Sequence, residues 1–571
     1  MLRAFLIKMK KIDNIIQNLK PTEKILFYFF SAIFVVTSVI MIIRVHTYFL
    51  VEVPTFGGNF TEGVVGPVRF INPIIAISDT DRDVVSLVYS GLLKNDLSGE
   101  LIPDLAESYN ISEDGTIYNI ILKDNIYFHD GKEITADDVV FTVEKILDPI
   151  IKSPRRANWE GVLVEKVSDK ELNFILAKPY SPFIQSLTVG ILPKHIWENA
   201  TPEEFPFSEY NINPIGSGPY KIEKITRNSG GIPTTIVLSA FNKYNPEKPK
   251  IKNVTFKFYQ NENDLVKAYT DKSIDSIGGL TLGTANDILN DRSIIKTSSL
   301  PRVFGLFFNQ NISPVFLNKE VRQALEISTP KKYIIDEVLF GFGKPLNGPA
   351  PSQIEEDDSK SQGNIDEAKE LLLSSGWKID EEDAILFKEN KDGKVRLSFS
   401  ISTSDSPELK RTAEILKEAW RKLGAEVEIK VFEQSDLSQN IIKGRKYEAL
   451  LFGKVVGEKS DLYPFWHSSQ RMDPGLNISL YANITVDKNL EEMQKNFNTD
   501  ENNERKVVII NQIKEDLPAI FLFSPDMIYI PSPKINNINL KNISSSNERF
   551  LNITDWYIET EKVWKIFQSK N

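Results

Sequence analysis

The chain has 571 residues, a formal net charge of −10 and a sequence pI near 5.3, with 41% hydrophobic and 26% charged residues. This composition is that of a globular protein with enough chain for three or four folding units, and its acidity argues against a nucleic-acid partner. Cysteine is absent, which excludes disulfides, thiolate metal sites, cysteine nucleophiles and a lipidated cysteine. The four histidines do not stand at metal-ligand spacing, so no imidazole metal site is expected.

Residues 25–43 are nineteen consecutive uncharged, mostly apolar residues. As a helix they would rise about 28 Å, close to the roughly 30 Å of a hydrocarbon core. Basic residues predominate before them, so we expect a single-pass transmembrane helix, with residues 1–24 as a basic cytoplasmic tail and the main domain outside the cell membrane. The alternative is a cleaved signal peptide, but the run ends in Arg44-Val45-His46 rather than at a small-residue cleavage site.

The first half of the chain mixes strand and helix patterns. Thr135 and Asp138 stand at capping-box spacing at the start of a helix, which Pro149 should end. The patterns predict strands at 64–77, 117–122, 125–128, 162–167, 171–176, 236–238, 254–259 and 303–309, and helices at 83–93, from 135 and at 264–270.

The second half repeats helices followed by strands. Asn364 should cap a helix that runs through Leu373, and the helix at 408–423 should end at Gly424 before a strand at 426–432. Further helices are expected at 491–498 and 505–516, and a late strand at 521–531. Helix, glycine and then strand indicates an α/β layer.

Two groups of motifs stand about a hundred residues apart. The first group is Pro103-Asp104-Leu105-Ala106-Glu107-Ser108, Ser112-Glu113-Asp114-Gly115-Thr116, Phe128-His129-Asp130-Gly131 and Thr135-Ala136-Asp137-Asp138-Val139, and the second is Gly216-Ser217-Gly218-Pro219-Tyr220 and Phe241-Asn242-Lys243-Tyr244-Asn245. Further motifs are Leu306-Phe307-Phe308-Asn309, Val321-Arg322-Gln323-Ala324-Leu325, Gly341-Phe342-Gly343-Lys344-Pro345, Phe465-Trp466-His467-Ser468-Ser469 and Asp516-Leu517-Pro518-Ala519-Ile520-Phe521. This ordered series, from about Asn72 to Pro531, resembles the extracytoplasmic solute-binding proteins of peptide ABC importers, the dipeptide- and oligopeptide-binding family (bacterial family 5).

The resemblance implies an α/β, two-lobed periplasmic-binding-protein-like fold of the large class, with an extra subdomain, after the transmembrane helix. It divides the chain into lobe I at 52–95, the extra subdomain at 96–209, lobe I again at 210–305, lobe II at 306–510, and a return to lobe I with the C-terminal segment at 511–571. We expect Gly216–Tyr220 to be a structural turn, with direct ligand contact as the alternative, and His129-Asp130-Gly131 to close a hairpin.

The implied function is that of a membrane-anchored substrate-binding component of an ABC importer. It would capture peptides between the lobes and deliver them to permease subunits, as a monomer with no catalytic residue, metal or cofactor. Alternative ligands are a nickel chelate, haem, an oligosaccharide or an opine. A sensory or adhesion module that reuses the fold stays open. A hydrolase is disfavoured, because the chain has no Gly-x-Ser-x-Gly elbow and its histidines are scattered.

Two stretches depart from the family pattern. Ser328-Thr329-Pro330 stands where the family continues its helix, and Pro330 should shorten or re-cap that helix. The usual glycine-tryptophan pair before the ligand aspartate is missing from the segment 452–461. The second departure affects the expected ligand contacts and does not affect the expected fold.

The resemblance places the ligand's ammonium group at Glu458, with Asp461 as the second acid of the segment. A carboxylate there would form a charge-assisted bond with the amino end of a peptide. Lys454 would meet a carboxylate, and Tyr463 and Trp466 would wall the cleft. Each has a plain alternative: loop acids for Glu458 and Asp461, a surface lysine for Lys454, and second-lobe core for the two aromatic residues.

Asp79 and Thr80 complete the expected ligand-binding set. They stand just after the first predicted strand, where relatives bring backbone close to the ligand. The alternative is a polar cluster that caps the following helix.

Overall fold

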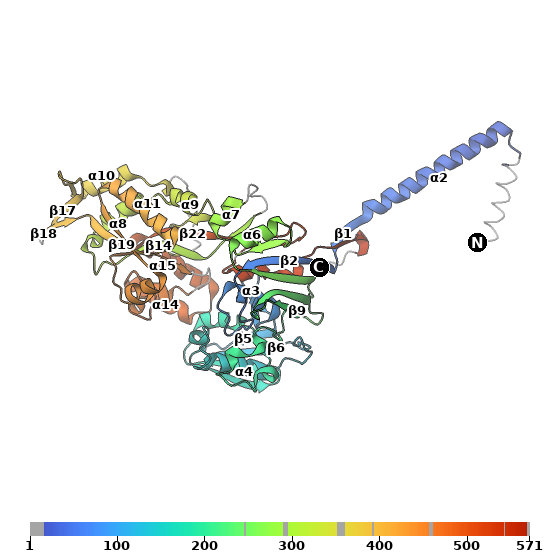
Figure 1. Cartoon of the computed structure of the whole chain (residues 1–571), viewed down its shortest axis with the longest axis horizontal. Coiled ribbons are helices and arrows are strands. Elements are labelled where there is room, and N and C mark those ends of the chain that lie inside the picture. The colour runs from blue at the N-terminus through green and yellow to red at the C-terminus, as the bar shows by residue number, and fades with distance from the viewer. Residues whose placement is uncertain are drawn as a thin grey trace. The chain divides into compact units, whose positions relative to one another are not determined.

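The computed structural model describes residues 16, 18–244, 247–288, 295–350, 360–390, 393–455, 461–541 and 543–567. They form two compact units (Figure 1). The terminal unit combines the N-terminal residues up to Gly57 with the C-terminal residues from Tyr557, and the main unit runs from Gly58 to Trp556.

The terminal unit is a long helix followed by a two-stranded ribbon. Helix α2 spans Pro21–Phe49 and continues directly into β1 (Leu50–Pro54), which pairs antiparallel with β23 (Thr560–Trp564). Among the described residues, α2 is the one helix long and apolar enough to cross a membrane, with a mean hydropathy of 2.5 and none of that window buried. A short strand from each end of the chain therefore pairs next to this helix.

A twelve-stranded mixed sheet forms the centre of the main unit. Ten strands are in the order β20-β19-β21-β14-β22-β12-β2-β11-β10-β9, and β13 and β15 pair with β22. Their bounds are β2 Gly57–Val65, β9 Tyr220–Arg227, β10 Pro233–Ala240, β11 Ile251–Tyr259, β12 Ser276–Gly278, β13 Lys296–Ser299, β14 Arg302–Phe308, β15 Gly343–Pro345, β19 Ser398–Ser404, β20 Glu426–Phe432, β21 Ala449–Val455 and β22 Ala519–Ile530.

Strand β22 belongs to both halves of this sheet. Its first half pairs with β14, and its second half pairs with β12 and β13. The chain thus crosses between two lobes at Leu300–Pro301 and again at Ser524–Pro525, two segments joined by a hydrogen bond from the Leu300 N–H to the Pro525 carbonyl. The sequence-based division put these passages at 305/306 and 510/511.

The first lobe carries a four-stranded antiparallel sheet in the order β5-β6-β8-β7, covered by α4 (Ala136–Leu147). The strands span Ala106–Ile111, Ile117–Leu122, Glu171–Leu176 and Val162–Ser168 in that order. A small ribbon of β3 (Leu93–Asn95) and β4 (Leu101–Pro103) precedes them. Thr135 and Asp138 form the predicted capping box at the start of α4. The remaining helices of this lobe are α3 Asp79–Val88, α5 Lys194–Trp197, α6 Glu262–Thr270 and α7 Leu282–Ile288.

Helices cover both faces of the second lobe's sheet. One apolar core packs α8, α9, α10 and α11 against β14, β19 and β21, and the other packs α13, α14 and α15 against the opposite face (Figure 1). These helices span Lys319–Ile327, Lys331–Val338, Ile365–Ser374, Pro407–Leu423, Tyr463–Trp466, Ile484–Lys495 and Thr499–Asp516. A small sheet of β16 (Lys378–Ile379), β17 (Leu386–Asn390) and β18 (Gly393–Arg396) lies beside them.

Several predicted boundaries shift. The strand predicted at 64–77 is wrong over most of its length, because β2 ends at Val65 and irregular backbone with two prolines follows. The helix predicted at 83–93 begins at Asp79, where Ser78 caps it. Residues 125–128 form only an isolated bridge through Tyr127 instead of a strand. Pro330 re-caps the chain as expected, since α8 ends at Ile327 and α9 starts at Lys331.

A buried charge cluster binds the returning C-terminal segment to the first lobe. The Arg549 guanidinium donates two hydrogen bonds of 2.7 Å to the Asp83 carboxylate and one of 3.1 Å to Glu62, and the Tyr529 hydroxyl donates to Glu62 at 3.0 Å. Arg549 and Glu62 are at most 1% exposed. Burial raises the pKa of Glu62 to about 7, against the opposing charge of Arg549.

This raised pKa predicts a pH-dependent stability. Below about pH 4.5, the ordinary pKa of a glutamate, Glu62 is protonated in both the folded and the unfolded protein, and its contribution to stability is fully present. That contribution is lost as the pH rises through about 7, the pKa of Glu62 in the folded protein. The free energy of unfolding should therefore fall by up to about 1.4 kcal/mol per pH unit in that window. Urea denaturation at about pH 5 and about pH 8 measures the fall, which Glu62→Gln should reduce. An equal fall in parent and variant would contradict the assignment.

Candidate functional site

The two motif groups meet in the first lobe around His129. Its Nε2 lies 3.1 Å from the Gly218 carbonyl, and its Nδ1 accepts from the Gly216 N–H at 3.3 Å. A Cβ on Gly216 would stand 2.0 Å from the Val88 carbonyl oxygen, so the glycine is needed for close approach. Neither Gly216 nor Gly218 has a positive φ, which makes this run a packing element. Burial lowers the pKa of His129 to about 4.

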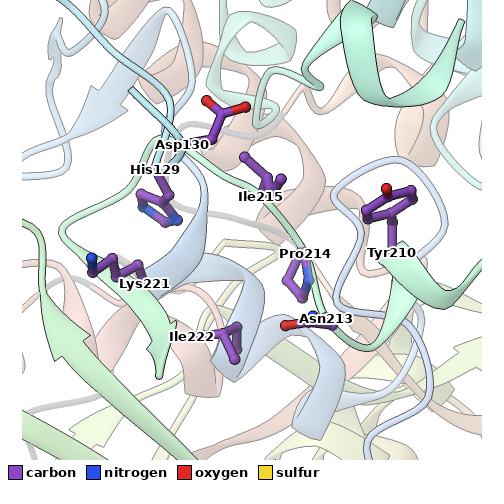
Figure 2. A pocket seen from close by; sticks show the side chains of 8 residues that line it. All are labelled: His129, Asp130, Tyr210, Asn213, Pro214, Ile215, Lys221 and Ile222. Atoms are coloured by element: carbon purple, nitrogen blue, oxygen red, sulfur yellow. The ribbon is translucent and has the colours of Figure 1, made fainter. Parts of the chain in front are cut away.

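An open pocket of about 250 Å³ lies beside this junction (Figure 2). Figure 2 shows Asn213, Pro214 and Ile215 along the segment that leads into the glycine run, with Tyr210 before them. Asp130, at the pocket rim, pairs with the His195 ring at 2.7 Å. Every residue that lines the pocket belongs to the first lobe, so the pocket is separate from the boundary between the lobes.

The boundary between the lobes has unpaired polar atoms on both sides of the chain crossing. Arg302 follows Leu300–Pro301, and Asp526 follows Ser524–Pro525. The Arg302 Nε and one Asp526 carboxylate oxygen are buried without a hydrogen-bond partner among the described residues. Burial raises the pKa of Asp526, while the charge of Lys344 and a hydrogen bond from the Ser299 side chain oppose the shift. Buried polar atoms normally have partners, so these two are candidates for contact with a ligand.

Strand β21 brings the predicted binding segment to the same boundary. Its last residue, Val455, pairs with Arg302 directly after the crossing. The described chain resumes at Asp461, which contacts the first lobe. Glu458 lies outside the described residues, so its role as the ammonium partner stays a prediction. The segment therefore both begins and ends at the boundary between the lobes.

Asp461 joins the extra subdomain to the second lobe. Its carboxylate accepts hydrogen bonds from the Tyr463 N–H at 2.9 Å, from the Gln494 side chain and from the Tyr180 hydroxyl at 3.5 Å. Tyr180 precedes the 3₁₀ helix η2 (Ser181–Thr188) of the subdomain, and Gln494 lies in α14. Burial raises the pKa of Asp461, against the three donors that lower it.

Two more contacts extend this junction. The Ser181 hydroxyl donates to the Met493 carbonyl at 3.1 Å, and the Tyr118 ring meets the Phe497 ring edge-on at 6.2 Å. These residues come from the subdomain on one side and from α14 and the turn after it on the other. The subdomain and the second lobe thus share a polar and aromatic contact that relative movement of the lobes must alter.

Lys454 lies inside the second lobe. Its ammonium group donates to the Leu476 carbonyl at 3.2 Å and stands 4.6 Å from the centre of the Phe307 ring and 5.2 Å from the Trp466 ring. The side chain is 7% exposed, and among the described residues no carboxylate pairs with it. Burial lowers its pKa well below the ordinary value, and nearby Arg445 adds to the effect. Lys454 thus lies in the core of the second lobe, next to aromatic rings.

The predicted aromatic residues occupy different positions. Trp466 is 1% exposed and packs against Tyr481 and Phe521 in the second-lobe core. Tyr463 is partly buried, stacks on His467 at 4.1 Å between ring centres and donates its backbone N–H to Asp461. Of the two rings, Tyr463 is the one next to the contact between the lobes.

Asp79 and Thr80 lie in the first turn of α3, far from these residues in sequence. The exposed Asp79 carboxylate pairs with Arg82 at 2.6 Å, and the buried Thr80 hydroxyl donates to the Val65 carbonyl at 3.0 Å. Both side chains have intramolecular partners at the start of the helix. The structure therefore brings Asp461 and Tyr463 together, places Lys454 with Trp466, and leaves Asp79 and Thr80 in the first lobe.

Sequence reasoning missed Tyr180, Gln494, Arg302 and Asp526. One signal was available for the last of them: Ser524-Pro525-Asp526 interrupts an otherwise apolar strand. A polar residue in a buried strand needs a partner or a ligand. The other three depend on contacts between residues far apart in the chain, which a single sequence does not reveal.

Comparison with known proteins identifies the family to which this architecture belongs. Residues 100–473 match the model of the bacterial extracellular solute-binding proteins, family 5, middle region. The chain belongs to this family. The two-lobed α/β fold expected from the motifs is confirmed.

Individual relatives agree with this assignment. The oligopeptide-binding protein AppA of Bacillus subtilis (strain 168) is 30% identical over 521 residues, which cover 88% of this chain and 92% of the relative. Its solved structure in complex with a nonapeptide is 27% identical, with a TM-score of 0.64 over 89% of this chain and 100% of that one. The structure of NikZ from Campylobacter jejuni in complex with Ni(L-His) is 26% identical, with a TM-score of 0.63 over 87% and 99%.

Proposed function

We propose that this protein is the receptor of a peptide ABC importer, which captures peptides between its two lobes and delivers them to permease subunits. The observation that carries the proposal is the boundary between the lobes. There the unpaired Arg302 and Asp526 atoms lie on either side of the chain crossing, Val455 pairs with Arg302, and Asp461 contacts Tyr180 of the first lobe. The similarity to the nonapeptide complex of AppA supports peptide as the ligand class.

A peptide suits these groups chemically. Its backbone offers N–H donors and carbonyl acceptors, which strand edges and isolated polar atoms recognise without reading side chains. Arg302 supplies a donor and Asp526 an acceptor. Glu458 supplies a carboxylate for the terminal ammonium group of the peptide. The charged ends of the ligand would then fix its register in the cleft.

The same receptor would be held at the cell surface by α2. The helix is long enough to span the hydrocarbon core, and basic residues precede its apolar part. We propose that it is retained as a single-pass anchor with the N-terminus in the cytoplasm, in place of a lipid tether. The binding unit would then lie outside the membrane as a monomer.

A second ligand class follows from one comparison, because the NikZ structure holds Ni(L-His) on the same fold. A nickel–histidine chelate also offers carboxylate oxygens as acceptors and N–H groups as donors, which suit the Arg302 donor and the Asp526 acceptor at the boundary between the lobes. Separate calorimetric titrations with peptide and with nickel–histidine distinguish the two classes, because only the ligand class that this chain binds should release saturable heat.

Binding should close the lobes. A chain lacking the first 49 residues, titrated with a mixture of nonapeptides, should release saturable heat, and its radius of gyration in small-angle scattering should decrease. The decrease is expected because a ligand that touches both lobes favours the closed population. Saturable nickel–histidine binding without peptide binding would replace peptide as the ligand. An unchanged radius at saturation would count against a closing receptor.

A further inference from the structure

The β1–β23 ribbon links the two ends of the chain beside the helix. All five residues of β1 pair with residues of β23, and the Thr55 N–H extends the ladder by donating to the Glu559 carbonyl at 3.0 Å. The main unit is therefore joined to this ribbon twice, at Gly57–Gly58 and at Trp556–Tyr557. A simple flexible tether would need only the first of these connections.

The length of α2 fixes the level of the ribbon relative to a bilayer. Its 29 residues rise about 43 Å, whereas the hydrocarbon core is roughly 30 Å thick and the whole bilayer about 40–45 Å. If residues 25–43 span the core, Phe49 lies about 9 Å beyond its outer edge. One headgroup layer is therefore about 5–8 Å thick, so the last turn of the helix, from His46, crosses this layer, and β1 starts at its outer edge.

Aromatic residues from both chain ends gather at this level. The Trp564 ring stacks on Phe49, with 6.2 Å between ring centres, and lies 5.3 Å from His46. Tyr48 is 83% exposed and Ile566 is 76% exposed. Tryptophan and tyrosine are enriched at membrane interfaces, because each has an apolar ring and one polar group.

We propose that the β1–β23 ribbon is an interfacial membrane element, in which Tyr48, Trp564 and Ile566 contact the headgroup and upper acyl region of the outer leaflet. The proposal rests on the anchoring proposed above. Its occupant is lipid, because these side chains continue the surface of a helix that crosses the bilayer. The C-terminal end of the receptor would thereby be returned to the membrane and limit the swivelling of the chain about its anchor.

Tryptophan fluorescence can test this contact, because Trp564 differs from the other tryptophans in its exposure. The other six tryptophans are at most 2% exposed, whereas Trp564 is 37% exposed. The full-length chain would be placed in phosphatidylcholine vesicles with plain or brominated acyl chains, since bromine quenches indole emission on contact. The difference between the parent and Trp564→Phe gives the emission of Trp564. We expect brominated lipid to remove most of this difference.

A matched control uses the exposed Phe207 of the first lobe, which is 88% exposed. Phe207→Trp in the Trp564→Phe background creates an exposed tryptophan on the main unit, and its emission should be the same in both lipids. Quenching of both tryptophans would show general lipid contact and overturn the proposal. An unquenched Trp564 would also overturn it, and would indicate that the ribbon contacts a protein partner such as the permease.

Alkaline carbonate extraction of the same vesicles separates this inference from anchoring. A chain that stays with the vesicles while Trp564 is unquenched retains its anchor and refutes the interfacial ribbon alone. A chain that the carbonate releases is not anchored, and both proposals fail together.

Discussion

Glu458→Ala should weaken binding of a peptide with a free amino end roughly 30-fold or more. Removing the carboxylate would leave the peptide's ammonium group without its partner inside a closed cleft, at a cost of about 2–5 kcal/mol. Calorimetric titration of a free peptide and its N-acetylated form against parent and variant measures the effect. The acetylated peptide should bind the parent poorly and be little affected by the substitution.

Asp461→Asn provides the matched control, because Asp461 already accepts hydrogen bonds from Tyr463, Gln494 and Tyr180. Loss of the Asp461 carboxylate should disturb the contact between the subdomain and the second lobe. Binding of the free peptide and of the acetylated peptide should therefore weaken to the same extent. If Glu458→Ala binds the free peptide as well as the parent does, Glu458 is not the ammonium partner. Selective loss in Asp461→Asn would then transfer the role to Asp461.

Arg549→Met should lower the free energy of unfolding by about 3–5 kcal/mol. The methionine would fill similar space but leave Asp83 and Glu62 buried without their shared cation. Urea denaturation at neutral pH measures the loss. Adding Glu62→Gln and Asp83→Asn to the variant should recover part of it, because the orphaned charges are then removed.

Arg421→Met is the control for loss of an arginine. Arg421 forms an ion pair with Glu418 in which both side chains are more than 60% exposed, so its substitution should cost less than about 1 kcal/mol. Equal losses in the two variants would mean that the buried cluster has no special part in holding the C-terminal segment to the first lobe.

Local chemistry made much of the fold predictable. The capping box at Thr135, the left-handed Gly424 after α11 and the re-capping at Pro330 each depend on a few neighbouring residues. The strand predicted at 64–77 failed where apolar residues lie in irregular backbone. Apolar residues that are buried in irregular backbone do not recur at the spacing of a helix or a strand, so their pattern does not reveal the local structure.

The candidate site was less predictable, because charge alone does not say which way a side chain faces. Lys454 has the sequence appearance of a ligand contact, yet it lies on the same face of β21 as Leu450 and Phe452, toward the second-lobe core. Asp461 was identifiable from the motif. Its partner Tyr180 stands 281 residues away in the chain, and only the folded structure reveals it.

The shared strand β22 has a consequence for how the receptor unfolds. Because one uninterrupted strand lies in the interior of both halves of the sheet, neither lobe can lose its fold without removing a central strand from the other. The main unit should therefore melt in a single cooperative transition despite its two lobes. A ligand that touches one lobe alone would then raise the melting temperature of both, so thermal shift reports occupancy wherever the ligand sits.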